Sequence, residues 1–176
     1  MTTERTINKT KIRLVRDDIT TLEIQAFVYY AQHNLKLGSG FGGAIAQRGG
    51  PKIEEELSSV GRLETGQATI SSAGELKAEY IVHAVGPRFQ EPDIEGKLHR
   101  TIIDVLQRAE KKGIKHIAFP PMGCGFYGIP LVVSADVTLE TFKEYLNGNT
   151  QLEEIVVCVT DNRELPFFES KLEKLT

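Results

Sequence analysis

The sequence predicts a single α/β domain, in which helices cover both faces of a mixed, mostly parallel sheet. Apolar runs of strand length alternate along the chain with segments of helical period. Several runs are apolar almost throughout, as in strands that are buried on both faces. No linker-like stretch interrupts this alternation, so we expect one domain over residues 1–176, with residues 1–10 as a loosely ordered N-terminal extension.

The first half of the chain predicts strands separated by short helices. Strands are expected at Lys11–Arg16, Ala26–Ala31, Gln67–Ser72 and Tyr80–Val85. Asp18 is expected to open a turn into a short helix, with Thr20 and Glu23 at capping-box spacing. Further helices are expected at Gly43–Arg48 and Lys52–Val60, the second with Pro51 at its first turn.

The second half continues the alternation with longer helices. The expected helix Glu95–Lys111 keeps one apolar face and ends at Gly113; the face consists of Leu98, Ile102, Val105, Leu106 and Ala109. A helix opened by Pro130 has a similar face, made of Val132, Ala135, Leu139, Phe142 and Leu146. Buried strands are expected at Ile114–Phe119 and Glu154–Val159, and a closing helix at Glu164–Leu175.

Two segments match the pattern G-x-G-x-x-G: the first glycine loop, Gly38–Gly43, and the second glycine loop, Gly123–Gly128. Each lies between an expected strand and an expected helix. Glycine lets a ligand approach the main chain, whose N–H groups can form an anion-binding nest beside the positive end of a helix. Neither loop contains lysine or arginine, so binding would depend on backbone donors. The pair suits a pyrophosphate gripped from two sides, whereas either loop alone could be an ordinary tight turn.

Composition restricts the classes of function. The net charge of −3 gives no basic footprint for nucleic acid. No apolar run is long enough to span a bilayer, and the polar first residues cannot serve as a signal peptide. The two cysteines, Cys124 and Cys158, are too few for a disulfide framework. We therefore expect a cytoplasmic protein with no membrane partner and no resident cofactor or metal, since the four histidines share no ligand spacing.

Four ordered motifs resemble those of the macrodomain family, the ADP-ribose-binding (Appr-1-p processing) module. They are Asp17-Asp18-Ile19-Thr20, Leu35 to Ile45 around the first glycine loop, His83-Ala84-Val85-Gly86-Pro87, and Ala118-Phe119-Pro120 through Gly128. The similarity runs from about Lys11 to Asn162. It implies a three-layer α/β/α fold and, as the ligand, ADP-ribose or a related nucleotide diphosphate, free or attached to a protein.

The resemblance also implies roles for particular residues. Asp18 would accept a hydrogen bond from the adenine amino group, helped by the backbone of Ile19. The first loop would hold the diphosphate and distal ribose, and the segment Cys124–Tyr127 would close over the diphosphate. The ligand-binding residues that we expect are Asp18, Ile19, Gln32, Gly38, Ser39, Gly40, Phe41, Gly42, Gly123, Cys124, Gly125, Phe126 and Tyr127.

The chain departs from the family's hydrolytic branch at several positions. Gln32 stands where that branch has a catalytic asparagine, and Gly42 where it has an aspartate thought to activate water. Ser39 replaces a loop glycine, and Thr160 stands where an aromatic residue often stacks on adenine. Gln32 is thus a weak catalytic candidate, because one extra methylene displaces its amide.

Several of these residues allow other interpretations. Asp18 could simply cap the following helix, and Gln32 could be a satisfied polar group at a strand end. Cys124 is better explained as a small side chain in a crowded loop than as a nucleophile, because no histidine is identifiable as its base. For the whole chain we weigh a module that binds ADP-ribose, a hydrolase of ADP-ribosyl esters and, more remotely, an NAD-dependent Rossmann oxidoreductase.

Overall fold

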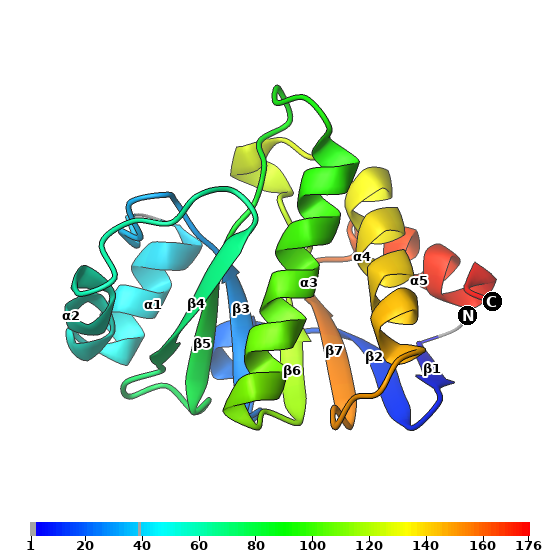
Figure 1. Cartoon of the computed structure of the whole chain (residues 1–176), viewed down its shortest axis with the longest axis horizontal. Helices are drawn as coiled ribbons and strands as arrows, with labels where there is room; N and C mark the ends of the chain where they lie inside the picture. Colours follow the sequence, from blue (N-terminus) through cyan, green and yellow to red (C-terminus); the bar gives the residue numbers. More distant parts are fainter. Residues whose placement is uncertain (1–2, 39) are drawn as a thin grey trace.

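The computed structural model describes residues 3–38 and 40–176, which form a sheet between two layers of helices (Figure 1). The sheet has seven strands in the order β1-β2-β7-β6-β3-β5-β4. Their bounds are β1 (Glu4–Ile7), β2 (Thr10–Arg16), β3 (Ala26–Tyr30), β4 (Gln67–Ser72), β5 (Tyr80–Val85), β6 (His116–Phe119) and β7 (Glu154–Val159). The five inner strands run parallel, and the two edge strands are antiparallel to their neighbours. The expected mixed, mostly parallel sheet is confirmed.

Helices cover both faces of the sheet. On one face lie α1 (Phe41–Gly49) and α2 (Lys52–Ser58); on the other lie α3 (Ile94–Lys112), α4 (Leu131–Leu146) and α5 (Leu165–Lys174), drawn in green, yellow and red (Figure 1). The expected apolar face of α3 is fully buried, and Gly113 ends the helix in the left-handed conformation. The apolar run of β3 is buried at every position, as a strand covered on both faces requires.

Three local expectations are wrong. Residues Glu4–Ile7 are not a loose extension, because they form β1 and pair with β2 from Glu4↔Arg13 to Ile7↔Thr10. The cap of the short helix η1 (Ile19–Thr21) is Asp18, whose side chain accepts from the Thr20 amide, so Thr20 is inside the turn instead of capping it. Val132 is 60% exposed and does not belong to the buried face of α4.

The parallel strands all end at the same edge of the sheet. The carboxyl ends of β2, β7, β6, β3 and β5 therefore present five neighbouring loops, at the upper edge in Figure 1. Both glycine loops belong to this row, the first after β3 and the second after β6, and these two strands are neighbours. Ligands of open α/β sheets bind at such an edge, so the fold brings the two loops to the expected place.

Candidate functional site

The first glycine loop is built on two glycines that adopt the left-handed region. Gly38 has φ of 65° and Gly40 has φ of 62°, and Gly40 is also the residue that precedes α1. Around Gly40 no described atom lies within 4 Å of where a Cβ would be, so its main chain is open to a ligand. Because α1 begins at Phe41, two residues earlier than expected, its N-terminal amides follow the loop directly. Ser39 lies outside the described residues.

The base of this loop is held by Tyr29 and by close packing at Gly42. The Tyr29 hydroxyl donates to the Leu37 carbonyl at 3.2 Å. A Cβ on Gly42 would lie 1.7 Å from that same carbonyl oxygen, so no side chain fits there. Burial raises the pKa of Tyr29 to about 12, which keeps the phenol protonated and able to donate. The Phe41 ring packs edge-on against Tyr29 at 5.2 Å and is partly buried against the core.

The second glycine loop has a different shape. Gly123 and Gly125 have φ of 77° and 74°, and no described atom lies within 4 Å of a Cβ placed on Gly125. Residues Gly125–Tyr127 form the short 3-10 helix η2, and α4 begins only at Leu131, after Pro130. The expectation that Pro130 opens the next helix is confirmed, because Pro130 is the residue that precedes α4. Gly128 ends η2 in the left-handed conformation, so the N-terminus of α4 does not follow the second glycine loop as directly as that of α1 follows the first.

Cys124 lies half-buried at the start of η2. Burial is the main influence on its thiol and raises its pKa to about 11, although a hydrogen bond with Ser134 acts in the opposite direction. A nucleophilic cysteine needs the opposite shift. The structure therefore favours the interpretation of Cys124 as a small side chain in the loop over that of a nucleophile.

Asp18 lies at the carboxyl end of β2, at the far side of the row from β5. Its Oδ1 accepts from the Thr20 amide at 3.0 Å and the Thr20 hydroxyl at 2.7 Å, and its Oδ2 accepts from Arg48 Nη1 at 2.6 Å. Burial acts to raise the pKa of the carboxyl, but the hydrogen bonds from Arg48 and Thr20 outweigh it and hold this pKa below its usual value. The group is thus an anion with acceptor capacity left toward solvent. The Ile19 side chain is buried in the core, so only its backbone is available to a ligand.

Gln32 lies directly against the first loop. A Cβ on Gly38 would lie 3.1 Å from Gln32 Nε2, so the side-chain amide of Gln32 packs directly against the main chain of Gly38. Thr160, at the end of β7, instead donates through its amide and hydroxyl to Glu164 at 2.7 and 2.8 Å. The site therefore brings Gln32 to the loop and turns Thr160 to the start of α5.

Two arginines that the sequence reasoning missed stand beside the site. Arg48, in the last turn of α1, reaches back to Asp18, and Arg88, after β5, lies with its guanidinium carbon 5.8 Å from the ring centroids of both Phe126 and Tyr127. Burial raises the pKa of Tyr127, and the charge of Arg88 acts against this shift. The only sequence signal was their proximity to the motifs, since neither lies inside a glycine loop.

The histidines do not build a metal site in the part of the chain that the structure describes, where no three His, Cys, Asp or Glu side chains gather. His83 is fully buried in β5, and its Nε2 lies 2.8 Å from the Ser71 hydroxyl. Its Nδ1 has no hydrogen-bond partner among residues 3–38 and 40–176. Burial lowers the pKa of His83 to about 3, so the ring is neutral at pH 7.

A groove of about 830 Å³ lies elsewhere, over the sheet face of β2 and β7. Its lining includes Arg13, Val15, Glu154 and Val156, together with His116 at the start of β6. None of the expected ligand-binding residues lines it.

Within the described chain, no helix is long and apolar enough to cross a membrane.

The structure defines an α/β protein with two glycine loops at one edge of its sheet. Comparisons with known proteins identify its family. The Macro domain family profile matches residues 28–138. A Macro domain-containing protein of Caldanaerobacter subterraneus is 35% identical over 95% of this chain and 98% of its own length. The ADP-ribose glycohydrolase MACROD2 of Xenopus laevis is 34% identical over 92% of this chain, which spans 40% of that protein.

A solved structure agrees. A point mutant of the Oceanobacillus iheyensis macrodomain with ADPR has a TM-score of 0.89 at 28% identity, covering 98% of this chain and 97% of that one. The chain belongs to the Macro domain family. The expected three-layer fold is thereby confirmed, and the Rossmann alternative is left without support.

Proposed function

We propose that this protein binds ADP-ribose along the edge of the sheet, with the diphosphate between the two glycine loops. The observation that carries the proposal is the pairing of these loops on neighbouring strands, β3 and β6. Each loop has a left-handed glycine beside open space, Gly40 in the first and Gly125 in the second. The macrodomain structure with ADPR supports the same ligand.

The order of strands suggests how the ligand lies. Asp18 and the Ile19 backbone, at the end of β2, would bind adenine. The loops after β6 and β3 would bind the diphosphate through residues Gly123–Tyr127 and Gly38–Gly42. The distal ribose would then lie by Gln32, toward β5, which is four strand positions from β2, or about 19 Å at the usual spacing between strands.

Hydrolysis of ADP-ribosyl esters is the second candidate, favoured by the identity to a protein named as an ADP-ribose glycohydrolase. The chain has few of the residues that such a hydrolase would need. Gly42 stands where the hydrolytic branch has an aspartate, and the contact with the Leu37 carbonyl leaves no room for one. Gln32 is the remaining amide near the loop. We therefore propose binding with slow or absent hydrolysis.

We also propose that this protein is cytoplasmic and that it recognises ADP-ribose attached to other proteins. Both cysteines are free thiols, which suits a reducing compartment. The open loops leave the distal end of the ligand accessible.

A paired assay on one protein sample tests the proposal. Calorimetry should give saturable binding of ADP-ribose that is at least about tenfold tighter than binding of AMP or ribose 5-phosphate, because both loops contact the diphosphate. An ADP-ribosyl-glutamate carrier protein should lose little label in the same preparation. Absence of heat with millimolar ADP-ribose would reject the binding function, and rapid release that Gln32→Ala abolishes would establish the hydrolase.

A further inference from the structure

Two exposed aromatic rings and an arginine stand together beside the second glycine loop. Phe126 is 83% exposed and Phe89 is 50% exposed. Arg88 directly precedes Phe89 in the sequence and lies over the Phe126 ring in space. We call these three residues the rim surface. Aromatic residues and arginine are enriched at the centres of protein interfaces, where they contribute most of the binding energy.

The main chain beneath the rim surface is firmly held. The Phe89 amide donates to the Tyr127 carbonyl at 3.0 Å, and the Tyr30 hydroxyl donates to the Pro87 carbonyl at 2.5 Å. A Cβ on Gly128 would lie 3.3 Å from the Phe89 Cβ, so the loop after β5 packs against the end of the second glycine loop. The exposed rings therefore stand on a fixed support, which lowers the entropy cost of binding a partner.

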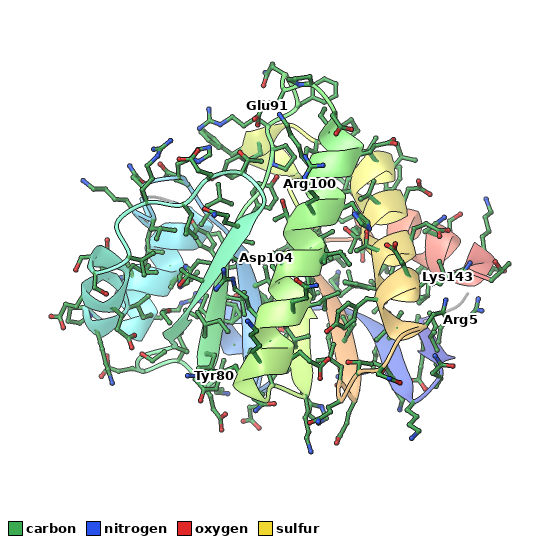
Figure 2. The ribbon with its side chains drawn as sticks, in the orientation of Figure 1. Arg5, Tyr80, Glu91, Arg100, Asp104 and Lys143 are labelled. Atoms are coloured by element: carbon green, nitrogen blue, oxygen red, sulfur yellow. The ribbon has the colours of Figure 1, made fainter. Side chains whose placement is uncertain are left out.

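The Arg88 guanidinium has no ion pair or hydrogen bond with any residue that the structure describes, 3–38 and 40–176. Glu91 is nearby, but its Oε2 accepts from the Arg88 main-chain amide and its Oε1 pairs with Lys97 at 3.5 Å. Arg100 is paired with Asp93 at 3.8 Å. Figure 2 shows Glu91 on the loop above α3 and Arg100 on α3 itself. Arg88 thus keeps its planar set of donors available to a carboxylate from outside.

The rim surface lies where a group attached to the ligand would emerge. This step rests on the proposed function. With adenine at β2 and the diphosphate between β6 and β3, the distal ribose points toward β5, and Arg88 and Phe89 follow β5. A small anion would need only Arg88, whereas two exposed phenylalanines offer apolar area that a polypeptide can cover.

We propose that the rim surface binds the polypeptide that carries ADP-ribose, and that it selects segments with an acidic residue beside the modified one. Arg88 pairs with that carboxylate, and Phe89 and Phe126 cover the neighbouring apolar part of the peptide. The free donors of Arg88 supply the charge complementarity, and the exposed rings supply the area.

Two synthetic peptides of equal length test this, both ADP-ribosylated on serine, one with flanking aspartates and the other with asparagines. Fluorescence anisotropy should show that the protein binds the acidic peptide about fivefold more tightly. Arg88→Gln should remove this preference while leaving the affinity for free ADP-ribose unchanged. Phe89→Ser should weaken both peptides equally. Arg100→Gln, which removes a paired arginine from the same end of α3, is the matched control and should keep the preference.

Equal binding of the two peptides by the unmodified protein, or a preference that survives in Arg88→Gln, would overturn the inference. So would an equal loss of free ADP-ribose and peptide binding in Arg88→Gln, because Arg88 would then serve the diphosphate itself. If free ADP-ribose does not bind at all, the proposed function fails. If free ADP-ribose binds but the two peptides bind equally, only the present inference fails.

Discussion

At the scale of single residues, Asp18 has a structural role in the fold and is the acceptor that we propose for adenine. Its Oδ1 caps η1 through Thr20, and its Oδ2 pairs with Arg48 while remaining close to solvent. The alternatives of helix cap and adenine acceptor therefore do not exclude one another, because Oδ1 makes the cap and Oδ2 could accept from adenine as proposed. Truncation to alanine would remove both at once, so a subtler substitution is needed.

Asp18→Asn should separate the roles. The asparagine oxygen can still cap η1, so stability should change by less than about 1 kcal/mol. Its amide would face the adenine amino group with a donor instead of an acceptor, so affinity for ADP-ribose and for AMP should fall about tenfold. Calorimetry and thermal melting measure the two effects. The matched control is Asp17→Asn, whose new oxygen can still accept from the Asp18 amide; equal affinity in both variants would remove the adenine assignment.

At the scale of elements, the junction between the first glycine loop and α1 depends on the absence of a side chain at Gly42. The Leu37 carbonyl fills the space that a Cβ would need, and Tyr29 holds that carbonyl from below. Replacing Gly42 by aspartate would thus disturb the loop instead of restoring a water-activating carboxylate.

Gly42→Ala should lower the free energy of unfolding by about 2 kcal/mol and weaken ADP-ribose binding, because the helix start must move away from Leu37. Gly43→Ala is the matched control in the same helix, since its Cβ would lie 3.3 Å from the Gly38 carbonyl and needs only a small adjustment. Denaturant melts and calorimetry give both quantities. Full stability and affinity in Gly42→Ala would show that the loop can rearrange freely.

Most elements could be predicted because their signals are local. The buried runs of β3 and β7 and the stripe of α3 follow directly from hydrophobic periodicity. Val132 is an exception, because periodicity does not reveal that this position in the first turn of α4 is exposed while its neighbours Leu131 and Val133 pack against the core. The short strand β1 alternates between exposed and partly buried residues and has no apolar run. It is a strand because it pairs with β2, and this pairing cannot be predicted from the local sequence.

The site could be predicted only in part, for the same physical reason. Glycine patterns identify loops, because left-handed backbone favours glycine whatever surrounds it. Arg48 and Arg88 acquire their meaning from contacts far along the chain, with Asp18 and with the rings of Phe126 and Tyr127. The two loops also continue differently, the first into α1 after Gly40 and the second into η2 after Cys124, although both match the same glycine pattern.

At the scale of the whole molecule, one buried histidine couples folding to pH. The sheet encloses His83 completely, with Tyr29 edge-on to its ring at 6.0 Å and Ser71 at its Nε2. The folded pKa is about 3, against 6.5 in an unfolded chain. The unfolded state therefore binds the extra proton between these values, so stability rises with pH across this window and is lost as pH falls.

The free energy of unfolding should decline below about pH 6.5, by up to about 1.4 kcal/mol per pH unit from His83 alone. His83→Gln should be less stable at pH 7 but show a flatter decline. Urea melts at a series of pH values measure the free energy of unfolding, and NMR of the His83 ring offers an independent check. A ring that titrates near pH 6.5 in the folded protein would contradict the prediction.

We propose that the two glycine loops bind one ADP-ribose diphosphate from opposite sides. The most direct measurement is a titration of the ¹⁵N-labelled protein with ADP-ribose, followed through backbone amide shifts. We predict that the amides of Gly40–Gly43 and Cys124–Tyr127 shift together with a single dissociation constant. Shifts confined to one loop, or gathered around the groove of Arg13 and Val156, would contradict it.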